Sequence, residues 1–371
     1  MENTKQTKRG YMLLVIVFTV IIGGLSIINL FVEAPFILIS ERRVPERMAA
    51  LSASNVASGD FMQQFEPFAA DNFPFREQFR TIRAAAVFGL LLQTDKDGIY
   101  MDLHGIGSFV EVDAVSVALA ADKIQVVAES LGDMNVFFAF IPDKSIYAQR
   151  AMPGFDAALT EQILRERLPD TFTFIPLVDA MDADSFYRTD LHWDQTQIGG
   201  VVDMLSDAMG IEITQDNFTA ELAGDFRGVY VGQLALPTAA EPLYFLENPN
   251  ISAFYINMGT REFEPGPVYD LDLFYGIDPY DIFLRGAQPL VVLENPNADS
   301  ERHLYLFRDS FASPLAPILA DAYATITLID FRFIDLRTVH QIIDFRPGSD
   351  VLFLYSSGIL NQSDMLLIPM P

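Results

Sequence analysis

The chain of 371 residues contains no cysteine, a single tryptophan and only four histidines. The absence of cysteine excludes disulfide bonds, cysteine-ligated zinc and thiol nucleophiles. Basic residues are also scarce, because 24 Lys and Arg face 50 Asp and Glu and give a net charge of −26. Such a surface repels nucleic acid at long range, and no basic cluster interleaved with aromatic residues occurs. We therefore predict that nucleic acid is not a partner.

One long apolar run is present near the N-terminus, at residues 11–32 (YMLLVIVFTVIIGGLSIINLFV), with no charge and no proline. It is long enough to cross a bilayer as a helix. A secretory signal peptide has a shorter apolar region and a small-residue cleavage site, so we favour an uncleaved anchor over a cleaved signal. Lys5, Lys8 and Arg9 precede the run. By the positive-inside rule, residues 1–10 are then cytoplasmic and the rest is extracytoplasmic, attached to the cell membrane by one span.

The segment that follows, residues 33–100, is predicted to be a juxtamembrane and helical lead-in. Its part at 60–93 is rich in phenylalanine and is interpreted as helices broken at Pro67 and Pro74. These side chains could lie on a membrane surface, but few basic residues accompany them. We therefore favour packing in a protein core.

Beyond this lead-in, short apolar strands alternate with helices, and 50% hydrophobic residues are enough for a sizeable core. This alternation is typical of an α/β fold with a mainly parallel sheet and helices on both faces. We predict one domain over 101–371, with 211–300 as an irregular insertion. The predicted strands are 135–141, 172–178, 303–307, 325–329 and 350–355, and the predicted helices are 114–132, 156–168, 194–210, one from 313 and 335–343.

The stretch TDLHWDQ, residues 189–195, contains the only tryptophan beside a histidine and two aspartates. Asp194 is followed three residues later by Gln197, which predicts a capping box at a helix start. Asp190 and His192 precede it, and an i, i+2 pair in extended backbone points to one side. The carboxylate could orient the imidazole for catalysis. The alternative is a pair that only fastens a loop.

A second candidate segment is HLYLFRDSFASPLAPIL, residues 303–319, which is interpreted as strand, turn and helix. Ser310 leaves the carboxyl end of the strand, where open α/β sheets gather their ligands. Helix-start N–H groups nearby could stabilise an oxyanion. Ser313 and Pro314 are predicted as N-cap and first helical residue, and Asp309 as the brace of the turn. Alternatively, Ser310 is only a turn residue.

Cofactor chemistry finds little support in the sequence. The D-x-H-x-D pattern at 190–194 could suggest a metal site, but His104, His303 and His340 are scattered along the chain. Neither a Walker lysine nor a G-x-G-x-x-G motif is present. We predict no metal and no other cofactor.

These motifs resemble those of a known family. YRTDLHWDQTQIGG resembles the T-D-H-H-W-T-x-x-G-A signature of the DHHW proteins, and the Ser310 segment resembles their K-D-S-Y-A segment. Four further pieces, FAADNFPFREQF, FIPDKSIYAQ, GDFRGVYVG and DVLFLYSSG, are similar to family segments in the same order, over about residues 60–360. DHHW proteins are relatives of the periplasmic alginate O-acetyltransferases. The resemblance implies an SGNH hydrolase-like, flavodoxin-like fold.

The resemblance also implies roles for the candidate residues, with Asp190 as orienting acid, His192 as base and Ser310 as nucleophile. The implied function is a serine-dependent O-acetyltransferase or O-acetylesterase that acts on a cell-surface polysaccharide. A multi-pass membrane O-acyltransferase would then be a partner that supplies the acyl group. The predicted substrate-binding residues near the site are Trp193, Lys144 and Tyr230.

The alternative function is a catalytically silent SGNH-like domain that binds glycan or assembles an envelope complex. Geometry separates the two functions. A base and its nucleophile should lie about 2.6–3.2 Å apart, or somewhat further apart without substrate.

Overall fold

The computed structural model describes residues 2–29, 35–48, 50–149, 154–298 and 300–369. The chain divides into two compact units. The first is formed by Met1–Gln93 with Gly232–Leu236, and the second by Thr94–Val231 with Pro237–Pro371.

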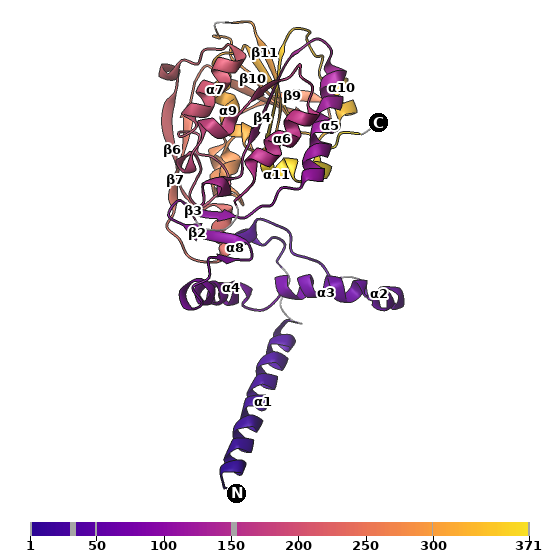
Figure 1. The fold of residues 1–371 in the computed structure, drawn as a ribbon, viewed down its shortest axis with the longest axis vertical. Coiled ribbons are helices and arrows are strands. Elements are labelled where there is room, and N and C mark those ends of the chain that lie inside the picture. The colour runs from indigo at the N-terminus through magenta and orange to yellow at the C-terminus, as the bar shows by residue number, and fades with distance from the viewer. Residues whose placement is uncertain (1, 30–34, 49, 150–153, 299, 370–371) are drawn as a thin grey trace. The chain divides into compact units, whose positions relative to one another are not determined.

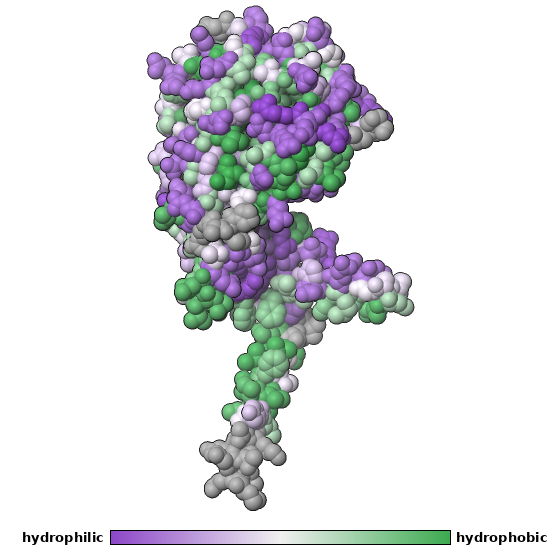
Figure 2. Space-filling view, viewed as in Figure 1, coloured by the Kyte–Doolittle hydropathy of each residue, from purple (hydrophilic) through white to green (hydrophobic). Residues whose placement is uncertain are grey.

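The first unit contains the apolar N-terminal helix α1, Glu2–Asn29. Its part Gly10–Asn29 has a mean hydropathy of 2.6 and is long and apolar enough to cross a membrane, by length and composition. Figure 2 shows the hydrophobic surface along this helix. Residues 30–32 of the predicted span lie outside the described part of the chain.

Three further helices of the first unit are short. They are α2 (Ala53–Ser58), α3 (Asp60–Asp71) and α4 (Arg76–Ala85), and α4 continues into a π-helical turn, Ala86–Leu90. The predicted break at Pro74 is confirmed, because it lies between α3 and α4. The predicted break at Pro67 is wrong, since α3 continues through it. A proline removes one helical hydrogen bond, and Pro67 is on the exposed side of α3.

The second unit is built on one large mixed sheet, which has eight strands among the described residues. Five neighbouring strands are parallel, and Phe307 of the fourth is in register with Ile329 on one side and Phe353 on the other. The predicted α/β fold is thereby confirmed. In spatial order the parallel strands are β5 (Thr173–Ile175), β4 (Asn135–Ile141), β13 (Asp350–Ser356), β11 (His303–Arg308) and β12 (Thr325–Ile329).

The segment 211–300 is not irregular, which corrects the sequence-based prediction. It extends the sheet beyond β12 with antiparallel strands β10 (Leu290–Glu294), β8 (Ser252–Asn257) and β9 (Glu262–Gly266). It also forms an antiparallel pair, β6 (Thr219–Phe226) with β7 (Glu241–Glu247). The turn motif at 248–250 joins β7 to β8, so turn residues separate regular strands.

Helices cover both faces of the large sheet (Figure 1). One core lies under α7 and α9, and the other under α5, α6, α10 and α11. The helices are α5 (Ala114–Leu131), α6 (Ala157–Arg167), α7 (Gly199–Met209), α9 (Ala312–Leu319), α10 (Leu336–Ile342) and α11 (Ser357–Leu360). The remaining elements include α8 (Val229–Leu234) and a small sheet of β1 (Asp95–Lys96), β2 (Ile99–Asp102) and β3 (Gly105–Ser108).

Capping side chains mark where helices begin, and two predicted helix starts differ from the structure. The Asp113 side chain accepts N–H bonds at the start of α5, and Gly132, with φ of 80°, ends that helix. Asp194 accepts the N–H of Thr196, but α7 begins only at Gly199, so Asp194 is not its N-cap. Ser313 lies inside α9, whose N-cap is Phe311, because Asp309 already caps this turn.

Candidate active site

Ser310 lies two residues beyond the end of β11, in a turn that Asp309 fixes. One Asp309 oxygen accepts the Phe311 N–H at 3.0 Å, and the other accepts the Ser356 N–H at 2.7 Å. Ser356 is the last residue of β13, the neighbouring strand. The predicted role of Asp309 as a brace is therefore confirmed, and Ser310 stands half-buried between two strand ends.

Most backbone N–H groups of this turn already donate a hydrogen bond within the turn, so few of them could bind an oxyanion. The Phe311 N–H donates to the Asp309 side chain, and the Ala312 N–H donates to the Asp309 carbonyl. The Ser313 N–H donates to the Ser310 carbonyl. In the part of the chain that the structure describes, the N–H of Ser310 itself has no acceptor. An oxyanion at this turn would therefore be stabilised by the Ser310 amide rather than by the helix start as a whole.

The side chains of Asp190, His192 and Ser310 form one hydrogen-bonded chain. His192 Nδ1 lies 2.7 Å from Asp190 Oδ1, and His192 Nε2 lies 2.8 Å from Ser310 Oγ. An ionised carboxylate can only accept, so Nδ1–H donates to Asp190 and a neutral imidazole accepts the serine hydroxyl at Nε2. The His–Ser distance lies within the range expected for a base and its nucleophile.

Asp190 is fully buried, and its position depends on residues from the 211–300 segment. Its Oδ2 accepts the Val229 N–H at 2.8 Å, and its Oδ1 also accepts the His192 N–H at 3.1 Å. Gly228 makes the first contact possible, because a Cβ there would overlap the Thr189 carbonyl and Asp190. The sequence motif GDFRG at 224–228 thus allows the Val229 N–H, which follows it directly, to reach the Asp190 carboxylate.

Glu241, on β7, holds the backbone just before Asp190. Its carboxylate accepts the N–H groups of Arg188 and Thr189, both at 2.7 Å, and also the Thr189 hydroxyl. The Thr189 hydroxyl in turn accepts the Gly228 N–H at 2.8 Å. Sequence reasoning missed Glu241, since nothing near it in the chain marks a lone glutamate as the partner of a distant loop.

Tyr280 was also missed by the sequence analysis. It belongs to the short 3-10 helix η8, Pro279–Ile282, and its ring stacks on the His192 ring with centroids 3.9 Å apart and planes 9° apart. Tyr280 is buried. It covers one face of the imidazole, excludes water from that face and limits rotation of the ring.

Trp193 is in the core, which corrects its predicted role as a substrate-binding residue. Its side chain has no exposed surface, and its indole N–H donates to the Phe311 carbonyl at 2.9 Å. Its ring also packs edge-to-face on Phe311, with centroids 5.4 Å apart. Trp193 therefore joins the loop of His192 to the turn of Ser310. This contact explains why the single tryptophan stands next to the histidine.

Lys144 and Tyr230 were also predicted to bind substrate, but both side chains are buried, which corrects that prediction. Lys144 is in the 3-10 helix η3, Lys144–Tyr147, and donates to the carbonyls of Tyr187 at 2.8 Å and Asp190 at 3.0 Å. Burial lowers the pKa of Lys144 to about 8. The Tyr230 hydroxyl lies 3.2 Å from that of Ser108, and burial raises its pKa. Lys144 therefore supports the Asp190 loop.

Arg308, the residue that ends β11, is fully buried. It donates to the Ser313 hydroxyl at 2.9 Å and to the Gln288 carbonyl at 3.3 Å. Its Nε has no partner in the described structure, and burial lowers the pKa of the guanidinium. The hydroxyl of Ser313 thus accepts a hydrogen bond from Arg308 and does not cap a helix.

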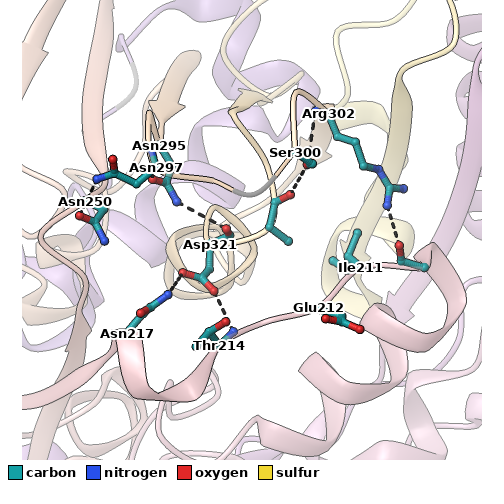
Figure 3. Close-up of a pocket in the computed structure, with 12 residues that line it drawn as sticks. Ile211, Glu212, Thr214, Asn217, Asn250, Asn295, Asn297, Ser300, Arg302 and Asp321 are labelled. Carbon is teal, nitrogen blue, oxygen red and sulfur yellow. Dashed lines mark hydrogen bonds between the residues drawn. The ribbon is translucent and has the colours of Figure 1, made fainter.

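Among the residues described, no group of three or more His, Asp or Glu side chains is placed to hold a metal ion. A polar cavity of about 190 Å³ lies beside Arg302, just before the start of β11, and does not include Ser310 (Figure 3). Its polar groups bond to one another: Asp321 accepts the Thr214 N–H and the Asn217 amide, and Arg302 donates to the Gly210 carbonyl. This cavity is separate from the candidate active site.

No family model matches the chain, and no curated protein matches it by sequence. Solved structures do resemble it. A DHHW family protein from Eubacterium siraeum is 16% identical, covers 74% of this chain and 95% of its own, and has a TM-score of 0.59. Bacillus cereus PatB1, solved with a sulfonyl adduct, is 18% identical, with coverage of 75% and 99% and a TM-score of 0.57.

The O-acetyltransferase domain of Pseudomonas putida AlgJ is 11% identical, covers 71% of this chain and 92% of its own, and has a TM-score of 0.42. The motifs around His192 and Ser310 predicted the fold that the first two structures show. The chain therefore has the α/β fold of this DHHW family protein and of PatB1.

Proposed function

We propose that this chain is an acyl-transfer protein that uses Ser310 as its nucleophile and acts on O-acetyl groups of a cell-surface polysaccharide. The observation that carries the proposal is the hydrogen-bonded chain from Asp190 through His192 to Ser310. This arrangement activates a serine for attack on an ester.

The reaction follows from the geometry. The Ser310 oxygen attacks the ester carbonyl while its proton passes to Nε2 of His192. Asp190, bonded to Nδ1, stabilises the imidazolium that forms. The Ser310 amide donates to the oxyanion. Collapse of the tetrahedral intermediate breaks the ester bond, and the departing alcohol takes the proton from Nε2. Ser310 is left acylated.

A second alcohol or water then completes the reaction. It loses its proton to Nε2 of His192 and attacks the acyl-serine. The bond between the acyl group and the Ser310 oxygen then breaks, the product ester or free acid leaves, and Ser310 regains its proton from Nε2. Water, present at about 55 M, competes with the sugar for the acyl group, so transfer requires that the protein hold a sugar hydroxyl next to the acyl-serine. Groups held in the right geometry reach effective concentrations of about 10⁵ M and above. The proposal includes a multi-pass membrane O-acyltransferase as the source of acyl groups.

The proposed location is the outer side of the cell membrane, with α1 as the anchor. Its support is the length and apolar composition of Gly10–Asn29 and the three basic residues of α1 that precede this apolar part.

The first prediction tests Ser310 directly. With a soluble acetyl ester and no acceptor, we expect slow hydrolysis by the wild type. Ser310→Ala should lower this rate roughly 10³-fold or more, because no other group replaces the nucleophile. Ser313→Ala is the matched control, since it removes a hydroxyl three residues away that bonds to Arg308 and not to His192. It should retain the activity.

A sulfonyl fluoride provides an independent readout. An activated serine oxygen displaces fluoride and forms a sulfonate ester, and His192 takes the proton. Mass spectrometry should place this adduct on the peptide that contains Ser310, and Ser310→Ala should not be labelled. Wild type that is neither labelled nor faster than Ser310→Ala on several acyl esters would instead support a silent, glycan-binding domain.

A further inference from the structure

The first unit leaves a set of large apolar side chains uncovered by protein. We call Phe75, Phe79, Ile82 and Leu90–Leu92 the α4 apolar surface, and their exposed fractions range from 47% to 78%. Figure 2 shows a hydrophobic surface over the end of α4. This exposure contradicts the prediction that the phenylalanines of residues 60–93 pack in a core. An uncovered patch of this kind marks an interaction site.

The polar side of α4, in contrast, faces the protein. Arg76 and Arg80 both pair with Glu41, at 2.6 Å and 2.8 Å, and Arg80 also donates to the carbonyls of Gly232 and Gln233. Phe75, Phe79 and Ile82 have i, i+4, i+7 spacing, so they share one face of the helix. This face differs from that of the two arginines, and its side chains are exposed. A helix of a water-soluble protein buries its apolar face instead. Ion pairs therefore fix α4 with its apolar side outward.

The neighbouring helix α3 shows the same property. Phe61, Phe65 and Phe68 follow one another along it at helical spacing, and their rings contact each other, with centroids 6.0 Å and 6.4 Å apart. Phe65 and Met62 are exposed. The apolar residues of α3 contact one another rather than a protein core.

Charge and chain length indicate what covers the α4 apolar surface. Residues 35–92 carry six arginines and six acidic residues and are neutral, whereas the whole chain has a net charge of −26. This segment can therefore approach a bilayer surface with far less electrostatic repulsion than the acidic part of the chain beyond residue 93. Five residues, 30–34, separate it from α1, and a connection of this length spans at most about 20 Å. If α1 crosses a membrane, this segment stays close to that membrane.

We infer that the α4 apolar surface lies in the interfacial layer of the lipid bilayer that α1 enters, with Phe75, Phe79, Ile82 and Leu90–Leu92 inserted at the boundary between headgroups and acyl chains. Aromatic and aliphatic side chains on one helix face are the usual means by which helices lie in this layer. The chain is then held to the membrane at two places. This inference depends on the proposal that α1 is an anchor and is independent of any activity of Ser310.

The absence of cysteine makes a direct test possible. The full chain is reconstituted into phosphatidylcholine vesicles as single-cysteine variants that carry a nitroxide label. The variants are Phe79→Cys, Ile82→Cys and Leu91→Cys. Collisions with apolar oxygen and with a water-soluble nickel chelate are measured at each label. Leu222→Cys is the matched control, because Leu222 is an equally exposed leucine of the second unit.

The inference predicts that the ratio of oxygen to nickel collisions is several times higher at the three α4 labels than at Leu222→Cys. Thermal unfolding of each variant checks that the fold is kept. Nickel collisions equal to those at Leu222→Cys would overturn the inference, because the surface would then face water. Labels shielded from both reagents would overturn it as well, since a second protein copy would then cover the surface.

Discussion

At the scale of single residues, the two nitrogens of the His192 ring have different partners, Asp190 at Nδ1 and Ser310 at Nε2. Nδ1 donates to a buried carboxylate and Nε2 accepts from Ser310. Tyr280 covers one face of the ring. The imidazole is therefore held in the tautomer and orientation that its proposed role as general base requires.

Lys144 allows a prediction about pH. Burial lowers its pKa from 10.5 to about 8. Below pH 8 the folded and unfolded chains both carry the charged lysine, and the folded state bears the full burial penalty. Between pH 8 and 10.5 the unfolded chain binds more protons at this residue, so the contribution of Lys144 to the free energy of unfolding rises with pH.

Comparison with Lys144→Met isolates this effect from the other titrating groups. The free energy of unfolding of wild type minus that of Lys144→Met should increase across this pH window by at most about 3 kcal/mol. Denaturant titrations of the detergent-solubilised chain at several pH values measure it. A difference that stays flat would show that Lys144 keeps an ordinary pKa, and one that falls with pH would show that its pKa is raised; either result contradicts the prediction.

At the scale of elements, the site is assembled from two separate parts of the chain. The turn between β11 and α9 carries Ser310, whereas the His192 loop is held by elements of the 211–300 segment. Val229 and Glu241 bond to this loop, and Tyr280 stacks on it. The strands of this segment therefore serve to place Asp190 and His192.

Gly228→Ala tests this arrangement. The added Cβ would overlap the Thr189 carbonyl and Asp190, so the backbone must move and the bond from Val229 to Asp190 is weakened. We expect ester hydrolysis to fall about 10- to 100-fold, as small displacements at a catalytic group commonly cause. The free energy of unfolding should fall by roughly 1–3 kcal/mol.

Gly199→Ala is the matched control, because Gly199 begins α7 and a Cβ there meets nothing within 4 Å. This variant should keep its activity and be as stable as wild type, or slightly more so. Equal activity of the two variants would show that the contact at Gly228 does not position Asp190.

At the scale of the whole molecule, the distribution of charge and apolar residues separates two kinds of surface. The strongly acidic part lies beyond residue 93, while α1 to α4 present exposed apolar side chains and little net charge. This division is what a chain with one end in lipid and the other in water requires.

The topology of the chain can be measured with reporters. Because Lys5, Lys8 and Arg9 precede the apolar part of α1, Gly10–Asn29, we expect the N-terminus inside and a reporter fused after Pro371 outside the cytoplasm. Alkaline phosphatase, which is active only after export, should be active in this fusion, and a cytoplasmic fluorescent protein should not. Activity of the cytoplasmic reporter alone would reverse the proposed orientation.

The sequence by itself determined the α/β alternation, because buried strands such as 136–141 and 351–355 are continuous apolar runs with clear ends. It also indicated Asp190, His192 and Ser310, since polar residues with this chemistry follow a strand end or precede a helix. The apolar run at α1 was equally visible, because the length of a membrane span is a local property of the chain.

Only the tertiary structure decided which side chains meet. Glu241 and Tyr280 are 51 and 90 residues from Asp190 in the chain, and no local pattern marks a contact over such separations. The burial of Trp193 and Lys144 and the exposure of Phe79 were likewise outside the reach of the sequence. Periodicity shows that a helix has an apolar face, but the surrounding fold decides whether protein covers that face.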